Sequence, residues 1–280
     1  MENLSVDDNI IEISKQNEKQ EFLKDNNEII KEGIFGRKKH FPFNFTNKIS
    51  KHKINDCVGK IEYKNKENGK EEESSGTCFF CKLPKIDKIF IITNNHAIGQ
   101  KELDTFKVIK ILINDKIDKS IDLSIKRIKY TNEKMDFIII EILESDYIDD
   151  FLFVDDLIYE SNYKNKKIYG LQFPLGKELS FSDGKIEKIE NGQIRHNIST
   201  NLGSSGAPII SKENHKVIGI HCGRDNQSNI GIFLKNVIDD ILINNPNIQN
   251  EESEKKITKL YYKLLKKKFF YQFLVLLLIL

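Results

Sequence analysis

The sequence has 280 residues, of which 39% are hydrophobic and 10% aromatic, so it can bury a sizeable core in one large domain or two small ones. Its 44 basic residues nearly cancel its 42 acidic ones. The overall charge therefore gives no electrostatic reason to expect that the protein binds nucleic acid or a membrane.

The first segment, residues 1–53, is charged and rich in Asn, and it lacks the basic start and apolar run of a secretory signal. We therefore expect a cytoplasmic protein. Apolar pairs such as Ile10 with Ile11 and Phe22 with Leu23 would suit one or two short amphipathic helices. We interpret the segment as a flexible N-terminal extension outside the folded body, and a regulatory arm is the alternative.

Residues 54–245 consist of short apolar runs separated by polar turns, and many runs are β-branched with two-residue alternation. This pattern is typical of an all-β body. One helix is predicted over 236–243, where the apolar spacing changes to three and four before Pro246. The predicted strands are 58–61, 76–80, 89–92, 106–113, 121–125, 137–142, 167–171, 184–189, 208–210, 217–220 and 231–234.

The four cysteines are Cys57, Cys78, Cys81 and Cys222. Without a secretory signal the expected compartment is reducing, which favours free thiols over disulfides. Cys78 and Cys81 have the spacing of zinc and redox motifs, but positions three apart on a strand point to opposite faces. We therefore expect no metal site.

His96 and Asp136 stand where acid–base chemistry would need them. His96 follows the apolar strand 89–92, a rigid support for an imidazole that can act as a base near neutral pH. Asp136 precedes the strongly apolar strand 137–142, where a partly buried carboxylate needs hydrogen bonds, and the second imidazole nitrogen could supply one. Taken singly, His96 could be an ordinary loop histidine and Asp136 a cap at the start of its strand.

The segment Gly203–Pro208 holds Ser205 in a glycine-bounded turn ahead of an apolar strand, which is how a nucleophilic hydroxyl is presented. Backbone N–H groups of Gly203 and Ser205 could form a hole for the oxyanion that develops when a carbonyl is attacked. Glycine tolerates a positive φ and the close approach of a substrate. A flexible turn between two strands is the alternative interpretation.

The order His96, Asp136, Ser205, with the glycine turn last, resembles the triad of chymotrypsin-like serine proteases. The resemblance covers roughly residues 55–245 and implies two packed six-stranded antiparallel β-barrels with the active site in the cleft between them. The first barrel would span about 54–150, the second about 160–235, and the helix about 236–243. The segments that carry the resemblance are 76–80, 93–97, 136–140, 170–174 and 203–208.

Residues 197–208 and 213–223 are more closely similar to the glutamyl endopeptidase branch, in which a Thr or Ser and a His hold an acidic side chain ahead of the scissile bond. Thr200 and His221 occupy those two positions, and both can donate hydrogen bonds to a carboxylate. A His221 that simply packs on its strand is the alternative. Ser204 and Ala97 depart from the wider family, since they replace the aspartate of trypsin-like zymogen activation and a disulfide cysteine of secreted relatives.

The last segment, residues 246–280, is acidic at first, strongly basic from Lys255 to Lys268, and almost wholly apolar at its end. The apolar end is shorter than the ~20 residues that a spanning helix needs. Docking on an anionic membrane surface, a packed C-terminal helix and the stub of a longer segment all remain open.

Two functions follow from these patterns. The first is a serine endopeptidase that acts on a polypeptide substrate with Ser205 as nucleophile, His96 as base and Asp136 as its orienting acid, without metal or cofactor. The second is a protease-fold module that binds or regulates without turnover. The presence of all three side chains favours the first.

Overall fold

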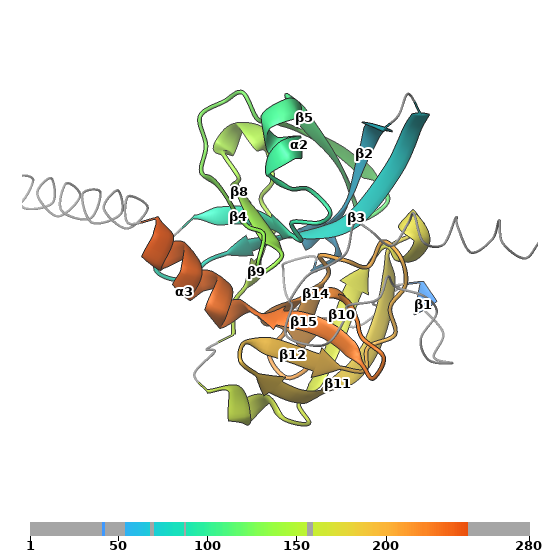
Figure 1. Cartoon of the computed structure of the whole chain (residues 1–280), viewed down its shortest axis with the longest axis vertical. Helices are drawn as coiled ribbons and strands as arrows, with labels where there is room; N and C mark the ends of the chain where they lie inside the picture. Colours follow the sequence, from blue (N-terminus) through green and yellow to red (C-terminus); the bar gives the residue numbers. More distant parts are fainter. Residues whose placement is uncertain (1–40, 43–53, 68–69, 87, 156–158, 246–280) are drawn as a thin grey trace, which may run out of the picture.

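The computed structural model describes residues 41–42, 54–67, 70–86, 88–155 and 159–245, which are mostly β-structure (Figure 1). The expected N-terminal extension, except residues 41–42, and the expected basic and apolar tail lie outside these residues. No helix among the described residues has the length and apolar character that crossing a bilayer requires.

The first sheet is a curled, open sheet. Seven of its eight strands follow the order β6-β5-β2-β3-β4-β8-β7 with antiparallel ladders, and β9 pairs parallel with β3. In the described chain no ladder joins β6 to β7 at its two ends, so the sheet curls without closing. The bounds are β2 Val58–Glu67, β3 Lys70–Lys82, β4 Ile89–Thr93, β5 Val108–Ile113, β6 Ile117–Asp122, β7 Lys129–Asn132, β8 Phe137–Glu141 and β9 Leu152–Phe153.

The second sheet closes on itself. Strand β11 pairs with β10 through its first half and with β12 through its second half, which completes the ring β11-β10-β13-β14-β15-β12. Strand β1 adds to β11 outside this ring. The bounds are β1 Phe41–Pro42, β10 Lys167–Gln172, β11 Ser180–Glu190, β12 Gln193–His196, β13 Pro208–Ser211, β14 Val217–Arg224 and β15 Asn229–Phe233.

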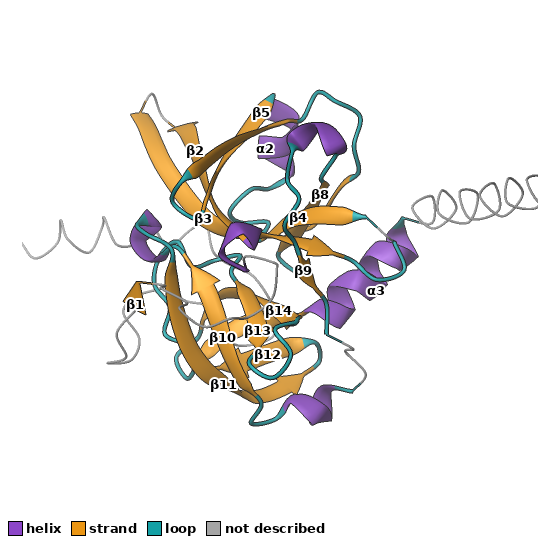
Figure 2. Cartoon of the chain, turned by 180° about the vertical axis from the view of Figure 1, so that it is seen from behind, coloured by secondary structure: helices purple, strands orange, loops and turns teal. Residues whose placement is uncertain are grey.

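The helix α3, Leu234–Asn244, follows β15 and lies where the two sheets meet (Figures 1 and 2). Its buried side chains, such as Val237 and Ile241, join the apolar core. Its Asp240 accepts hydrogen bonds from Tyr130 and Asn132 of β7, so the last helix also ties down the first sheet. The remaining helical segments are short: α2 Gln100–Thr105 and the 3-10 turns Ile54–Cys57, Glu144–Asp146, Glu160–Tyr163 and Pro174–Gly176.

Strand β3 divides the apolar core into two clusters. Phe79 and Cys81 belong to a cluster that draws residues from both sheets, whereas Cys78 and Phe80 belong to a cluster built from the first sheet. The prediction that Cys78 and Cys81 point to opposite faces is therefore confirmed. All four cysteines are buried free thiols.

The predicted all-β class with a C-terminal helix is confirmed, and the second barrel has the six strands expected. The first barrel differs in being a half-barrel that stays open. The predicted strand 121–125 is wrong in its second half, since β6 ends at Asp122. There the Asp122 carboxylate accepts hydrogen bonds from the backbone N–H and the hydroxyl of Ser124, which favours a turn.

Candidate active site

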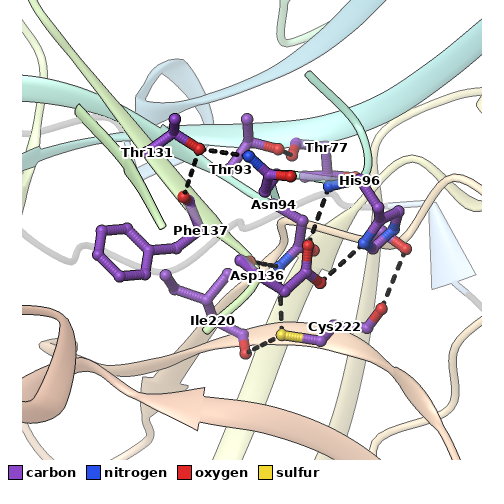
Figure 3. Close-up of polar contacts among 11 residues, drawn as sticks. Thr77, Thr93, Asn94, His96, Thr131, Asp136, Phe137, Ile220 and Cys222 are labelled. Carbon is purple, nitrogen blue, oxygen red and sulfur yellow. Dashed lines mark hydrogen bonds and ion pairs between the residues drawn. The ribbon is translucent and has the colours of Figure 1, made fainter. Parts of the chain in front are cut away.

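His96 and Asp136 form a close pair in which both carboxylate oxygens contact the histidine (Figure 3). Asp136 Oδ2 lies 2.7 Å from His96 Nδ1, and Asp136 Oδ1 accepts the His96 backbone N–H at 2.9 Å. An ionised carboxylate only accepts hydrogen bonds, so the imidazole proton of neutral His96 stays on Nδ1. The basic nitrogen is therefore Nε2, as a proton acceptor for a neighbouring hydroxyl requires.

Asn94 joins this pair to the second sheet. It is fully buried in the turn after β4, and its Nδ2 donates to the backbone carbonyl of Asp136 at 2.8 Å and to Cys222 Sγ at 3.1 Å. Asp136 has a φ of +52°, a left-handed value that costs energy for a residue with a side chain. The hydrogen bond from Asn94 holds the peptide of Asp136 in this conformation.

Ser205 lies in the turn between β12 and β13, and that turn needs both of its glycines. Gly203 and Gly206 have φ values of +85° and +87°. A Cβ on Gly203 would lie 2.6 Å from the Phe173 carbonyl oxygen, and one on Gly206 would overlap the carbonyl oxygen of Thr77. The expectation that glycine is required here for positive φ is confirmed, and both glycines also lie close to backbone carbonyls of neighbouring segments.

The backbone N–H groups of residues 203–206 differ in whether they donate hydrogen bonds within the protein. Ser204 N–H donates to Asn201 O at 2.9 Å and Gly206 N–H donates to His221 O at 2.8 Å. Within the described ranges, the N–H groups of Gly203 and Ser205 donate to no protein acceptor. These are the two amides expected to stabilise an oxyanion, and they alternate with the two that are already bonded.

Cys222 on β14 contacts both halves of the site. Its carbonyl oxygen accepts a long hydrogen bond from Ser205 Oγ at 3.4 Å, and its sulfur accepts one from Asn94 Nδ2. Cys222 is thus connected directly to Ser205 and, through Asn94, to Asp136 and its partner His96. His96 and Asp136 lie next to strands of the first sheet, and Ser205 lies next to a strand of the second. This is the division between two bodies that the sequence resemblance implies.

Thr200 and His221, expected to hold an acidic side chain, are both buried. Thr200 Oγ1 donates to Asn229 Oδ1 at 3.1 Å. His221 Nδ1 lies 3.1 Å from Nε2 of His196, which is paired with Asn229 in the ladder between β12 and β15. The two residues are therefore linked through His196 and Asn229.

His196 determines which nitrogen of His221 carries a proton. Burial, with a smaller contribution from His221, holds the pKa of His196 well below its usual value, so the ring is neutral. Its Nδ1 accepts the Ile198 backbone N–H at 3.3 Å, so its proton lies on Nε2 and is donated to His221 Nδ1. Neutral His221 is therefore protonated on Nε2, which makes that nitrogen a donor.

Sequence reasoning missed three residues of this site: Thr77, Asn94 and His196. Thr77 and Asn94 lie inside two of the segments that carried the resemblance, 76–80 and 93–97, but a polar residue next to a strand has many ordinary roles. His196 had no signal of its own, since its partner His221 is 25 positions away. Among the described residues no group of three or more His, Cys, Asp or Glu side chains could hold a metal ion.

The chain is similar to known proteins in three comparisons. The family described as "Trypsin-like peptidase domain" matches residues 76–220, just over half of the chain. Three glutamyl endopeptidase sequences of Staphylococcus epidermidis are 34% identical over 85 residues, which make up 29% of this chain and 30% of those relatives. The solved structure titled "Crystal structure of Rv3671c protease, inactive form" matches with 15% identity and a TM-score of 0.48, over 67% of this chain and 88% of that one.

Proposed function

Since this chain belongs to the trypsin-like peptidase domain family, we propose that it is a serine endopeptidase with Ser205 as its nucleophile. The observation that carries the proposal is the pair His96–Asp136, in which both oxygens of the acid are spent on the histidine and leave Nε2 as the base. This arrangement suits His96 for proton transfer, because it fixes both the tautomer and the orientation of the imidazole.

In this proposal Ser205 Oγ attacks the carbonyl carbon of a polypeptide while His96 Nε2 takes the hydroxyl proton. The N–H groups of Gly203 and Ser205 stabilise the oxyanion, a role typically worth about 3 kcal/mol of barrier for each donor. His96 then returns the proton to the leaving amine as the C–N bond breaks. Water, activated by the same imidazole, releases the acyl group from Ser205.

A fluorophosphonate probe tests this directly, since it bonds covalently to an activated serine with loss of fluoride. The wild-type chain should be labelled on Ser205, and Ser205→Ala should not be labelled. His96→Ala should be labelled at least about 100-fold more slowly, because general-base catalysis contributes about that much. Thermal unfolding of all three proteins shows whether they are folded. A folded wild type that takes up no probe would support the second hypothesis, a module without turnover.

We further propose that the enzyme prefers an acidic residue before the scissile bond. Two observations support this: the 34% identity to glutamyl endopeptidases, over part of both chains, and the proton that His196 places on Nε2 of His221. Thr200 contributes only when its hydroxyl turns from Asn229 towards the substrate, because its proton is donated to Asn229 here. His221 is therefore the main donor in this proposal.

Matched peptides that differ only in Glu or Gln before the cleaved bond test the preference. The wild type should have a kcat/KM for the Glu peptide at least about tenfold higher, since a charge-assisted hydrogen bond is about twice as strong as a neutral one. His221→Gln should reduce this ratio towards one, and Thr200→Val should reduce it less. Equal cleavage of both peptides by the wild type would remove the acidic preference and leave the triad proposal intact.

A further inference from the structure

Thr77 forms two hydrogen bonds to the nucleophile turn, residues 203–206, and two more to neighbouring segments. It is fully buried on β3 of the first sheet. Its backbone N–H donates to Ser205 O at 2.9 Å, and its hydroxyl donates to Gly203 O at 2.7 Å. The same hydroxyl accepts the Phe173 backbone N–H at 3.1 Å. Its carbonyl accepts the hydroxyl of Thr93 at 2.7 Å (Figure 3).

We propose that Thr77 is a positioning residue for the oxyanion hole of Gly203 and Ser205, a role that rests on the proposed function. Thr77 acts through the peptides of the turn and does not touch the reacting atoms. Its hydroxyl is the part that an apolar side chain of the same shape could not supply, because it donates and accepts a hydrogen bond at the same time.

The hydrogen bonds fix four successive peptide planes. Leu202 O accepts the Leu175 N–H at 2.5 Å, which holds the plane that carries the Gly203 N–H. Ser204 O accepts the Ala207 N–H at 3.0 Å, which holds the plane that carries the Ser205 N–H. Because a peptide is planar and trans, fixing the carbonyl fixes the direction of the N–H on the opposite side.

Thr77 holds the two planes that alternate with these. Its hydroxyl bonds to Gly203 O, in the plane between Gly203 and Ser204, and its N–H bonds to Ser205 O, in the plane between Ser205 and Gly206. Gly203, at its positive φ, lacks the side chain that would otherwise limit rotation of its neighbouring planes. The hydroxyl of Thr77 therefore supplies the restraint that glycine cannot.

The hydrogen bond from the Phe173 N–H connects the Thr77 hydroxyl to the segment 173–175, and the Leu175 N–H of that segment holds the Leu202 carbonyl. Leu175, two residues on, has a left-handed φ of +59° and is half exposed. Such a conformation persists in a non-glycine residue only where its surroundings hold it. Loss of the Thr77 hydroxyl would release the Phe173 N–H and so loosen the turn whose Leu175 N–H holds the Leu202 carbonyl.

Thr77→Val and Thr77→Ser separate the hydroxyl from the shape of the side chain. Valine keeps the branched volume and removes both hydroxyl bonds, whereas serine keeps the hydroxyl. The control is Ser211→Ala, which removes a fully buried hydroxyl from β13. That hydroxyl accepts a hydrogen bond from the Glu213 N–H, away from the nucleophile turn. Thr77→Ala is a second variant without the hydroxyl.

The readouts are the second-order rate of fluorophosphonate labelling, corrected for the folded fraction, and kcat and KM on a peptide. Thr77→Val and Thr77→Ala should lower the labelling rate and kcat about 10- to 100-fold, as expected for a misplaced oxyanion donor, with KM within about twofold of the wild type. Thr77→Ser should recover most of the rate, and Ser211→Ala should match the wild type.

Two outcomes would overturn the role of Thr77 and leave the proposed function intact, provided that the wild type is labelled. One is an unchanged labelling rate in folded Thr77→Val, and the other is a Thr77→Ser variant that is labelled as slowly as Thr77→Val. A rise in KM with kcat unchanged would also overturn it, since that result means a substrate-binding role. A folded wild type without any labelling would overturn the proposed function and the role of Thr77 with it.

Discussion

The side-chain amide of Asn94 donates a hydrogen bond to the backbone carbonyl of Asp136 at 2.8 Å, while its own Oδ1 accepts none from any described residue. An unbonded acceptor in a fully buried side chain costs about 1–3 kcal/mol of stability. The amide cannot turn over to relieve this, because Oδ1 would then face the Asp136 carbonyl oxygen. Asn94 therefore lowers the stability of the fold, but it holds Asp136 in the geometry of its pair with His96.

Replacing Asn94 should therefore affect activity more than folding. In Asn94→Leu the carbonyl of Asp136 loses its donor, its left-handed peptide can relax, and the carboxylate shifts away from His96. We expect fluorophosphonate labelling to fall about tenfold or more, while the free energy of unfolding in urea changes by about 1 kcal/mol or less. Asn95→Leu, at the neighbouring position, is the control. Normal labelling per folded molecule in Asn94→Leu would contradict this prediction.

The two bounding glycines of the nucleophile turn should not tolerate a methyl group. In Gly206→Ala the new Cβ would overlap the Thr77 carbonyl at a φ of +87°, so we expect a cost of about 1–3 kcal/mol and a loss of labelling of about 100-fold. Gly170→Ala on β10 is the matched control, since its Cβ would meet the Ile198 side chain at 3.5 Å, an ordinary contact. Equal behaviour of the two variants in denaturation and labelling would show that the turn can rearrange.

Mild acid should destabilise the fold through His196. The folded chain keeps this ring neutral at a pKa well below 6.5, whereas the unfolded chain protonates it near 6.5. Below pH 6.5 the unfolded state therefore binds more protons, so stability falls as the pH falls, by up to about 1.4 kcal/mol per unit. Urea unfolding at pH 7.5, 6.0 and 5.0 should show a smaller loss for His196→Gln than for the wild type. Parallel curves for the two proteins would be evidence against this origin.

Three of the thiols should be inert while the chain is folded. Burial raises the pKa of Cys57, Cys78 and Cys81 far above their usual value, so almost no thiolate exists at pH 8. A short iodoacetamide pulse followed by mass spectrometry should leave these three unmodified in buffer and alkylate them in urea. Alkylation of any of them in buffer at the rate seen in urea would show that burial does not protect that thiol in the folded chain.

The sequence alone predicted the features that repeat along the chain or depend on near neighbours. Apolar runs located most strands, and a change of apolar spacing located α3 to within two residues of its start and one of its end. Glycines on both sides of Ser205 predicted a turn with positive φ, which is found. The close pairing of His96 with Asp136 was expected from their places beside two apolar strands, which turn out to be neighbours in the first sheet.

The features that escaped prediction depend on contacts between distant positions. Thr77 and Gly203 are 126 positions apart, and Asn94 and Cys222 are 128 apart. No local pattern distinguishes such a threonine or asparagine from one that merely ends a strand. Closure of the second sheet likewise depends on β11 changing partners along its length, which periodicity cannot reveal. The proposed specificity of Thr200 and His221 stays a prediction.

The two sheets differ in how they can come apart. A ring of strands has no outermost member, so the body that presents Ser205 must break an interior ladder before any strand separates. In the described chain the open sheet can instead fray from its two outermost strands. One of them is β7, which is held by Asp240 of α3 and lies next to the β8 strand that follows Asp136. Backbone hydrogens near the acid should therefore exchange with deuterated water sooner than those around the serine, so that a chain beginning to unfold loses its base before its nucleophile.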